Sequence, residues 1–278
     1  MRNRMLPLCL MVLVGCGGAA TLGGSSPEMV YAVPGGGALI YDRSDSMSIA
    51  IDAPGMGSIT VVVGQLMTLG MTFASSGGGT RVRTSIERLA ASLTNPLSGP
   101  VTLTEADVHG DLVVQVDSRG RAEVIQTPTV ADVGGLVFNV TTLAHELLPK
   151  LPPPGTMIGG TWVDTTSYVG ADAPGSIEMT WIGTSRLVGD TLVDGRPLSL
   201  VRTDAEVTIE VRGTISGMEA TQSMAGPETG FYLWDRSRRA LVTHEVQRDL
   251  TGSSTVSALP TALALTAKLR RSMRLIGG

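Results

Sequence analysis

The chain has 278 residues, with 21 Lys and Arg against 25 Asp and Glu, which gives a formal net charge of −4. Without an excess of basic residues, the composition gives no support for a nucleic-acid partner. Glycine (35) and proline (15) are frequent, and aromatic residues make up only 4%. This composition is typical of a folded chain with many short connections and an aliphatic core, and its length can form one large β domain or two small ones.

The first residues are predicted to be a targeting segment. Arg2 and Arg4 precede an apolar run from Leu6 to Val14, which is much shorter than the roughly 20 residues that span a bilayer. The run ends in Leu13-Val14-Gly15-Cys16, which resembles the lipobox of bacterial lipoproteins. This resemblance implies that residues 1–15 are a removed signal peptide and that a lipid is attached to Cys16. The alternative is an ordinary secretory signal with an incidental cysteine.

Cys16 is also the only cysteine expected in the mature chain, because Cys9 lies in the removed segment. No disulfide within a monomer and no catalytic or metal-binding thiol are then expected. Removing residues 1–15 takes away two arginines, so the mature formal charge is about −6. Residues 16–27 are rich in Gly, Ala and Ser and are predicted to be an acylated flexible tether. Lipoproteins that are retained at the inner membrane have an aspartate after the lipid-bearing cysteine, whereas this chain has Gly17. By this resemblance, the expected location of the protein is the outer membrane, facing the periplasm.

From residue 28 to about 127, the chain shows short runs with strand-like alternation. The predicted strands cover residues 46–52, 58–63, 65–74 and 80–94. Their predicted ends are Pro54-Gly55, Gly64 and the glycine-rich residues 75–79. The run 80–94 fits either a helix or a strand, and the shared parity of Val82 and Ile86 favours a strand.

One segment has the period of a helix instead. Its apolar residues recur with the spacing of one helix face: Val133, Leu136, Val137, Val140, Leu143 and Leu147. Asp132 is placed to cap this helix, and Pro149 with Pro152–Pro154 would end it. Gly134 and Gly135 each cost roughly 1 kcal/mol relative to alanine, so packing must hold the helix. We therefore expect one packed helix near residues 132–148.

Strand patterns return after Gly155. Residues 206–212 alternate apolar Val and Ile with charged and hydroxyl residues, which predicts a strand with one dry and one wet face. Asp194-Gly195 predicts a two-residue hairpin turn. In the last stretch, residues 263–275, only Arg271 interrupts the apolar parity.

The opposite parity of this last stretch carries Lys268, Arg270 and Arg274. These cations are expected on a solvated strand face, with contact to anionic headgroups as the alternative.

A short motif, D-x-x-x-R-A-x-V, occurs at residues 117–124 and again at 235–242. Either coincidence or a duplicated β unit explains it. We predict a single β-rich domain at 28–278. If the motif reflects a duplication, this domain consists of two similar halves (28–128 and 156–278) joined by the helix.

The sequence contains no complete catalytic or metal-binding motif. His145-Glu146 begins like the zinc motif H-E-x-x-H, but Pro149 occupies the second ligand position. No nucleophile elbow G-x-S-x-G and no phosphate-binding G-x-x-x-x-G-K-[ST] is present. We therefore predict no catalytic residue, no metal and no cofactor, and Cys16 is the one residue to which a chemical role is assigned.

Other polar residues are expected to be structural. The three histidines, His109, His145 and His244, are far apart and are expected on the surface or in hairpins. The carboxylate pairs Asp42 with Asp45 and Asp164 with Asp172 are expected in turns. Pairs of this kind occur in any β protein and do not by themselves indicate catalysis.

The order of motifs after Pro152 resembles that of a group of uncharacterised bacterial lipoproteins. The motifs are the proline-rich break, Gly159-Gly160-Thr161-Trp162, and the segment from Gly230 to Asp235. At the level of the fold, the arrangement is similar to the unclosed barrels of periplasmic lipoprotein carriers of the LolA and LppX type. The resemblance implies a mainly β (α+β) fold, with a large curved antiparallel sheet or incomplete barrel and one packed helix.

These patterns lead to one functional prediction with two alternatives. We predict a membrane-anchored periplasmic lipoprotein without catalytic activity that binds a lipid or other apolar ligand between sheet and helix. Its partners are then the membrane, through the Cys16 lipid, and that ligand. The first alternative is a structural or assembly-scaffold envelope lipoprotein that binds protein partners. The second is a hydrolase whose site is assembled from distant segments.

Overall fold

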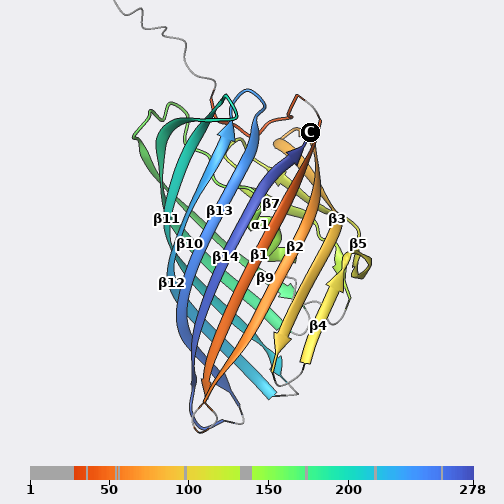
Figure 1. The fold of residues 1–278 in the computed structure, drawn as a ribbon, viewed down its shortest axis with the longest axis vertical. Helices are drawn as coiled ribbons and strands as arrows, with labels where there is room; N and C mark the ends of the chain where they lie inside the picture. Colours follow the sequence, from red (N-terminus) through yellow and green to blue (C-terminus); the bar gives the residue numbers. More distant parts are fainter. Residues whose placement is uncertain are drawn as a thin grey trace, which may run out of the picture.

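Long antiparallel strands make up most of the chain (Figure 1). The computed structural model describes residues 28–35, 37–53, 55, 57–96, 99–131, 140–172, 175–215, 218–257 and 259–278. The predicted signal peptide, Cys16 and the tether lie outside these described residues. Within them, no helix is both long enough and apolar enough to cross a membrane.

The strands before the helix are β1 (Ala38–Ala53), β2 (Gly57–Ser76), β3 (Gly79–Asn95), β4 (Gly99–Thr104), β5 (Val108–His109), β6 (Leu112–Val116), β7 (Ala122–Gln126) and β8 (Thr129–Val130). A 3-10 turn at Glu105–Asp107 precedes β5, and the helix α1 spans Val140–Glu146. The strands after α1 are β9 (Thr161–Asp172), β10 (Gly175–Val193), β11 (Arg196–Ile215), β12 (Met218–Asp235), β13 (Ala240–Val256) and β14 (Leu263–Gly277).

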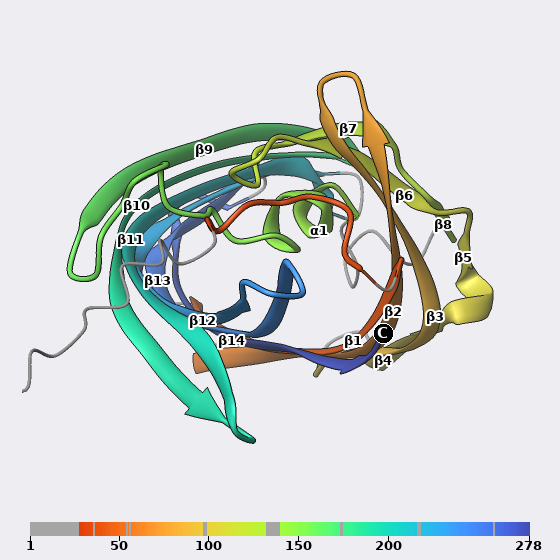
Figure 2. The same ribbon diagram turned by 90° about the horizontal axis from the view of Figure 1, so that it is seen from above.

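Twelve of these strands form one antiparallel sheet. Its order is β7-β6-β3-β2-β1-β14-β13-β12-β11-β10-β9, and β4 pairs with β3 outside this path. The first and last long strands, β1 and β14, pair along most of their length, so the two ends of the described chain meet in the middle of the sheet. The sheet curls into a half-barrel, and α1 lies inside the curl (Figure 2). The predicted fold class, a curved antiparallel sheet with one packed helix, is confirmed.

Each long strand presents one face to the interior and one to water. On β14, Leu265, Ala267 and Met273 are buried, whereas Lys268, Arg270 and Arg274 are exposed. This alternation follows from the two-residue repeat of a strand. The solvated face predicted for the three cations is therefore confirmed.

The interior contains two apolar clusters. The first, which we call the helix-filled core, packs Leu143 and Leu147 of α1 and the segment after it against strands and against Tyr31 and Trp234. The second, which we call the strand-only core, consists of residues that all come from strands: Tyr168, Met179, Val207, Met224, Leu250, Leu265 and Ala267, with Ile49, Ile51, Trp181 and Ile209 packed against them.

The predicted strands before the helix all lie within observed strands, but β1 begins at Ala38, eight residues before the predicted start at residue 46. The run 80–94 is a strand, β3, as its parity indicated. The predicted strand end at Gly64 is wrong, because β2 continues through it from Gly57 to Ser76. Gly64 is paired with Ser46 on one side and with Ser92 on the other, so both neighbouring strands hold it in the ladder.

The helix prediction is confirmed for the part that the structure describes. α1 ends at Glu146, close to the predicted stop, and Val140, Leu143 and Leu147 are all buried as their period requires. Asp132, Gly134, Gly135 and the rest of the predicted first turns lie outside the described residues.

Turn chemistry was also predicted correctly. Asp194 and Gly195 both have positive φ, 50° and 75°, and connect β10 to β11 as a two-residue hairpin. The repeated motif lies at hairpins in both places. Asp117 Oδ1 accepts the backbone N–H groups of Arg119 and Arg121 between β6 and β7, and Asp235 Oδ1 accepts those of Ser237 and Arg238 between β12 and β13.

Candidate functional site

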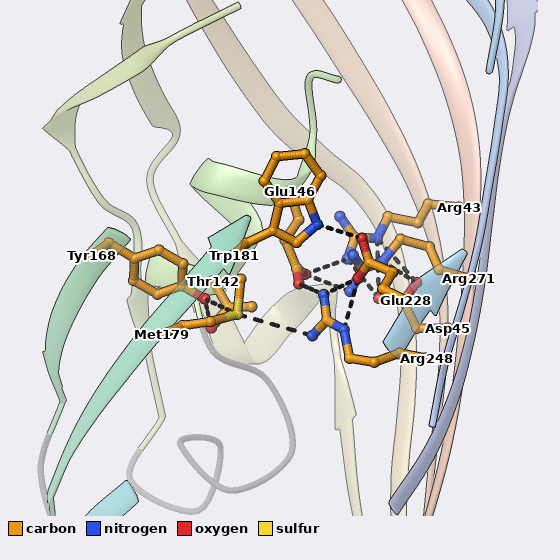
Figure 3. A network of polar contacts seen from close by, with 10 residues as sticks. All are labelled: Arg43, Asp45, Thr142, Glu146, Tyr168, Met179, Trp181, Glu228, Arg248 and Arg271. Carbon is orange, nitrogen blue, oxygen red and sulfur yellow. Dashed lines mark hydrogen bonds and ion pairs between the residues drawn. The ribbon is translucent and has the colours of Figure 1, made fainter. Parts of the chain in front are cut away.

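Six charged side chains meet inside the half-barrel (Figure 3). They are Arg43, Asp45, Glu146, Glu228, Arg248 and Arg271. Sheet register brings four of them together, because Asp45 lies directly opposite Arg271 and Glu228 directly opposite Arg248 on neighbouring strands. Opposite charges at such positions are within contact distance. We refer to these six residues as the charge cluster.

The strand residues of the charge cluster form two hydrogen-bonded groups. Arg271 Nε donates to Asp45 Oδ1 at 3.0 Å, and Arg43 Nη2 donates to Asp45 Oδ2 at 2.6 Å. In the other group, Arg248 Nε donates to Glu228 Oε2 at 2.7 Å. Trp181 Nε1 donates to the second oxygen of Glu228, also at 2.7 Å. Both carboxylates are therefore saturated by donors.

Glu146, at the end of α1, joins the two groups. Its Oε1 lies 3.2 Å from Nη2 of Arg248, and its Oε2 lies 3.6 Å from Nη2 of Arg43 and also pairs with Nη2 of Arg271. The Glu146 side chain is only 6% exposed. One carboxylate thus attaches the helix to β1, β13 and β14.

The charges stabilise one another in their ionised forms. Burial by itself would raise the pKa of Glu146, but the surrounding arginines, led by Arg271, hold that pKa below its usual value. The pKa of Asp45 is lowered in the same way, because Arg43 and Arg271 outweigh the effect of burial. General bases that act near neutral pH have carboxylate pKa values tuned upward. The lowered values therefore suit ion pairing and do not suit proton abstraction.

A small cavity adjoins the charge cluster on the side of α1. Its volume is about 80 Å³, and its lining includes His145, Lys150, Trp181, Tyr232, His244 and Arg248. Pockets for small organic ligands usually measure about 300–1,000 Å³. This cavity between sheet and helix has room for a few water molecules and does not admit an acyl chain.

Two basic groups at this cavity are shifted by burial. The pKa of Lys150 is lowered to about 8 by burial, and its Nζ donates to the Gly120 carbonyl at 2.6 Å. The pKa of His244 is lowered to about 3, first by burial and then by the charges of Arg271 and Arg43. Its Nδ1 is enclosed and has no hydrogen-bond partner among the described residues. Both side chains are thus held in an environment that disfavours added positive charge.

Several polar residues lie where the sequence prediction did not put them. Asp42 and Asp45 are on β1, and Asp164 and Asp172 are on β9, so the turn prediction for both pairs is wrong. Asp45 belongs to the charge cluster, and Asp164 pairs with Arg119 of the β6–β7 turn at 2.9 Å. In the strands, the charges of Asp45 and Asp164 are compensated by arginines.

The prediction for the histidines holds for one of the three. His109 is exposed, as expected. His145 is half-buried on α1 and stacks on Tyr168 with ring centroids 4.3 Å apart, and His244 faces the interior in the middle of β13. The prediction of surface or hairpin positions is therefore wrong for these two. Within the described residues, no three His, Cys, Asp or Glu side chains are arranged to hold a metal ion.

The charge cluster was missed as a group, although the sequence contained a signal for it. The strand residues of the cluster point to the same side of their strands as apolar neighbours. Arg271 lies between Leu269 and Met273 in this sense on β14. Arg248 lies between Val246 and Leu250 on β13. A charged residue on the dry parity of a strand indicates a buried partner. Which partner it meets depends on register, which the sequence did not provide.

Comparison with known proteins does not assign the chain to a family. No family model matches it, and no curated protein matches it. Among solved structures, DynF from the dynemicin biosynthesis pathway of Micromonospora chersina is 10% identical over 90% of this chain and 89% of that one, with a TM-score of 0.28. Neisserial surface protein A is 8% identical over 86% and 99%, with a TM-score of 0.22. OccK2 from Pseudomonas aeruginosa, in complex with glucuronate, is 4% identical over 86% and 98%, with a TM-score of 0.27. Scores this low support no argument about fold or function.

Proposed function

We propose that this chain is a lipid-anchored envelope protein without catalytic activity that holds an apolar ligand against the inner wall of the strand-only core. One observation carries the proposal. Ile49, Ile51 and Ile209 have the inward parity of their strands, yet they remain half-buried among the described residues. Apolar surface left accessible costs about 25 cal/mol per Å² relative to burial, and contiguous accessible apolar surface marks binding sites.

Register makes this inner wall continuous. One lateral row of paired residues crosses seven strands and consists of Tyr168, Met179, Ile209, Met224, Gly252, Leu265 and Ile51. Every member except Gly252 offers an apolar or aromatic side chain. Tyr168, Met179, Met224 and Leu265 of this row are already buried, so a ligand would replace contact with water mainly at Ile209 and Ile51.

The structure also limits where such a ligand can bind. The cavity between sheet and α1 is about 80 Å³ and is lined by charged groups, so the ligand is better accommodated beyond the charge cluster than against the helix. Each of the six side chains of the cluster itself takes part in at least one ion pair. This moves the predicted ligand from the sheet–helix contact to the strand-only core.

The envelope part of the proposal depends on the signal segment and on Cys16. The outer face of the sheet supports it, because exposed Lys268 and Arg270 lie on β14. A Lys or Arg facing lipid near the bilayer midplane costs roughly 2–4 kcal/mol. A domain with such an outer face is suited to water, and the lipid on Cys16 would then be what attaches it to a membrane.

Native mass spectrometry of the full chain, extracted from its own membrane, tests the ligand. We expect a co-purified apolar molecule that is lost from Ile209→Asn, because the added amide is inward. Thr208→Asn, the outward neighbour on β11, is the matched control and should keep the ligand. Ligand-free wild-type protein, or equal loss from both variants, would contradict the proposal.

The anchor is tested separately with Cys16→Ser. We expect loss of metabolic labelling by a fatty-acid analogue and a soluble or uncleaved protein. If the variant remains membrane-bound with the same mature mass, the lipoprotein assignment is wrong.

A specific surface feature favours the scaffold alternative. Val163 and Val169 on β9 and Ile182 on β10 are 63%, 69% and 50% exposed on the outer face. β9 ends the sheet and, within the described residues, pairs only with β10. An apolar strand at a sheet edge is a common site for a partner chain. A photo-crosslinker at Val169 should capture a discrete partner if this alternative holds, and Val62 on β2 is the control position.

A further inference from the structure

The outer face of the sheet carries a second hollow, on the opposite face from the strand-only core. Its volume is about 700 Å³, which falls in the range of ligand pockets. It extends over β11, β12, β13, β14 and β1. Its floor consists of two adjacent lateral rows of outward residues: Arg202, Phe231, Glu245, Ser272 and Ser44 in one, and Asp204, Thr229, Gln247, Arg270 and Ser46 in the other.

Side-chain size contributes to the hollow. On the β14–β1 side, Ser44, Ser46 and Ser272 are short, and Thr229 and Gly230 occupy the β12 position. Longer side chains stand around them, with Arg202 and Asp204 at one end. Phe231 is the one aromatic residue of the lining. The Phe231 ring is therefore surrounded by hydroxyl, amide and charged groups.

The charges of the hollow balance. Arg202 and Arg270 are opposed by Asp204 and Glu245. None of these four takes part in an ion pair or side-chain hydrogen bond with another described residue. In contrast, every member of the charge cluster inside the sheet takes part in an ion pair. The hollow thus offers donors and acceptors of both signs that remain available to a bound molecule.

We propose that this outer hollow is a binding site for a neutral oligosaccharide. An anionic or cationic ligand would favour a lining of one opposite charge, and a lipid would favour an apolar lining. A neutral sugar offers hydroxyl groups to Arg, Asp, Glu, Gln and Ser side chains, and its C–H face packs on an aromatic ring such as Phe231. The charge balance and the single ring match these two properties.

Binding of the detergent-solubilised full chain to an array of neutral and charged glycans is the primary test. We expect binding to a set of neutral oligosaccharides, and saturation-transfer NMR with the best of them should show contact between ring protons of the protein and sugar C–H groups. Binding to acidic glycans alone, to peptides, or to no glycan would overturn the proposal.

Variants locate the site. Phe231→Ala should weaken binding by at least about tenfold, the equivalent of about 1.4 kcal/mol, and Phe231→Tyr should retain it. Leu233→Ala removes an outward side chain from the same strand beyond the hollow and should have no effect. Asp204→Asn should weaken binding, whereas Glu206→Gln, two residues further along β11, should not. If Phe231→Ala and Leu233→Ala bind alike, the site is not this hollow.

The outcome is independent of the apolar ligand proposed for the interior. Phe231 and Asp204 face outward, so their variants should keep any co-purified apolar molecule. Ile209→Asn should lose that molecule and still bind the array.

Discussion

The two apolar cores of the half-barrel differ in how completely they are buried. In the helix-filled core, Trp234 is fully buried and Leu147 is 2% exposed. In the strand-only core, Val207 and Leu265 are equally well buried, but Ile49 and Ile209, which have the same inward parity, are half-buried. Both cores are built from aliphatic residues on long strands, so composition does not explain the difference.

What differs is the presence of a second layer. A sheet of twelve strands encloses more space than its own side chains fill, because barrel diameter grows with strand number. α1 and the segment after it fill that space on one side, where Tyr31 and Tyr232 donate their hydroxyls to the Pro149 and Lys150 carbonyls. The charge cluster ends the helix-filled core, since Glu146 attaches α1 to three strands. Beyond it, α1 contacts the strand-only core through His145 and Thr142 at Tyr168, and the other members of that core come from strands.

The largest expected effect is at the charge cluster. Arg271→Met removes one partner from both Asp45 and Glu146 and should lower the free energy of unfolding by roughly 3–5 kcal/mol, because buried carboxylates lose their compensation. Arg270→Met, the outward neighbour, should change it by about 0.5 kcal/mol or less. Urea denaturation measures both. Equal effects would show that the cluster does not hold the interior together.

Truncation compares the two cores directly. Leu147→Ala should cost roughly 2–5 kcal/mol, because it leaves a cavity in a filled region. Ile209→Ala should cost only about 1 kcal/mol in ligand-free protein, because its side chain is already half accessible. Similar losses would mean that the strand-only core is packed as tightly as the helix-filled core.

Acid should weaken the interior through His244. Its pKa is lowered to about 3, while in the unfolded chain it is near 6.5. The unfolded state therefore binds an extra proton between these values, so the stability contributed by the neutral ring is complete above pH 6.5 and is lost as the pH falls towards 3. Between pH 7 and pH 5 we expect a loss of about 1–2 kcal/mol, which His244→Gln should remove and His109→Gln should not.

An effect smaller than that of truncation in the helix-filled core is expected outside both cores, at the β10–β11 hairpin. Gly195 has φ of 75°, a conformation that costs an L-residue with a side chain roughly 1–2 kcal/mol. Gly195→Ala should therefore lower the thermal midpoint slightly. Gly77→Ala, in another hairpin where the added carbon meets nothing, is the control. A loss as large as that of Leu147→Ala would reverse the proposed order of the regions.

The sequence predicted the fold class and several local features because their causes are local. Alternation on β14 and the helical period around Leu143 report which faces are buried, and Asp194-Gly195 reports backbone conformation. The failure at Gly64 has the opposite cause. Its residue type favours a break, but two flanking strands that are distant in sequence hold it in the ladder.

The candidate site could be predicted only in fragments. Arg271 was recognised as an interruption of the apolar parity of its strand, and Asp45 as one of a carboxylate pair assigned to a turn. That the two face each other depends on β14 pairing with β1 across more than 200 residues of sequence. The half-buried inner wall and the outer hollow likewise depend on the lateral alignment of strands.

The periodicity of the strands and the turn at Asp194-Gly195 can thus be read from local sequence, whereas the lipid on Cys16 stays a prediction. Which strands are neighbours, which charges compensate one another, and which inward residues stay half-buried depend on the folded sheet. The physical reason is the range of the interactions. Side-chain parity and turn sterics act within a few residues, whereas register, ion pairing across strands and the filling of a curled sheet depend on contacts between distant segments.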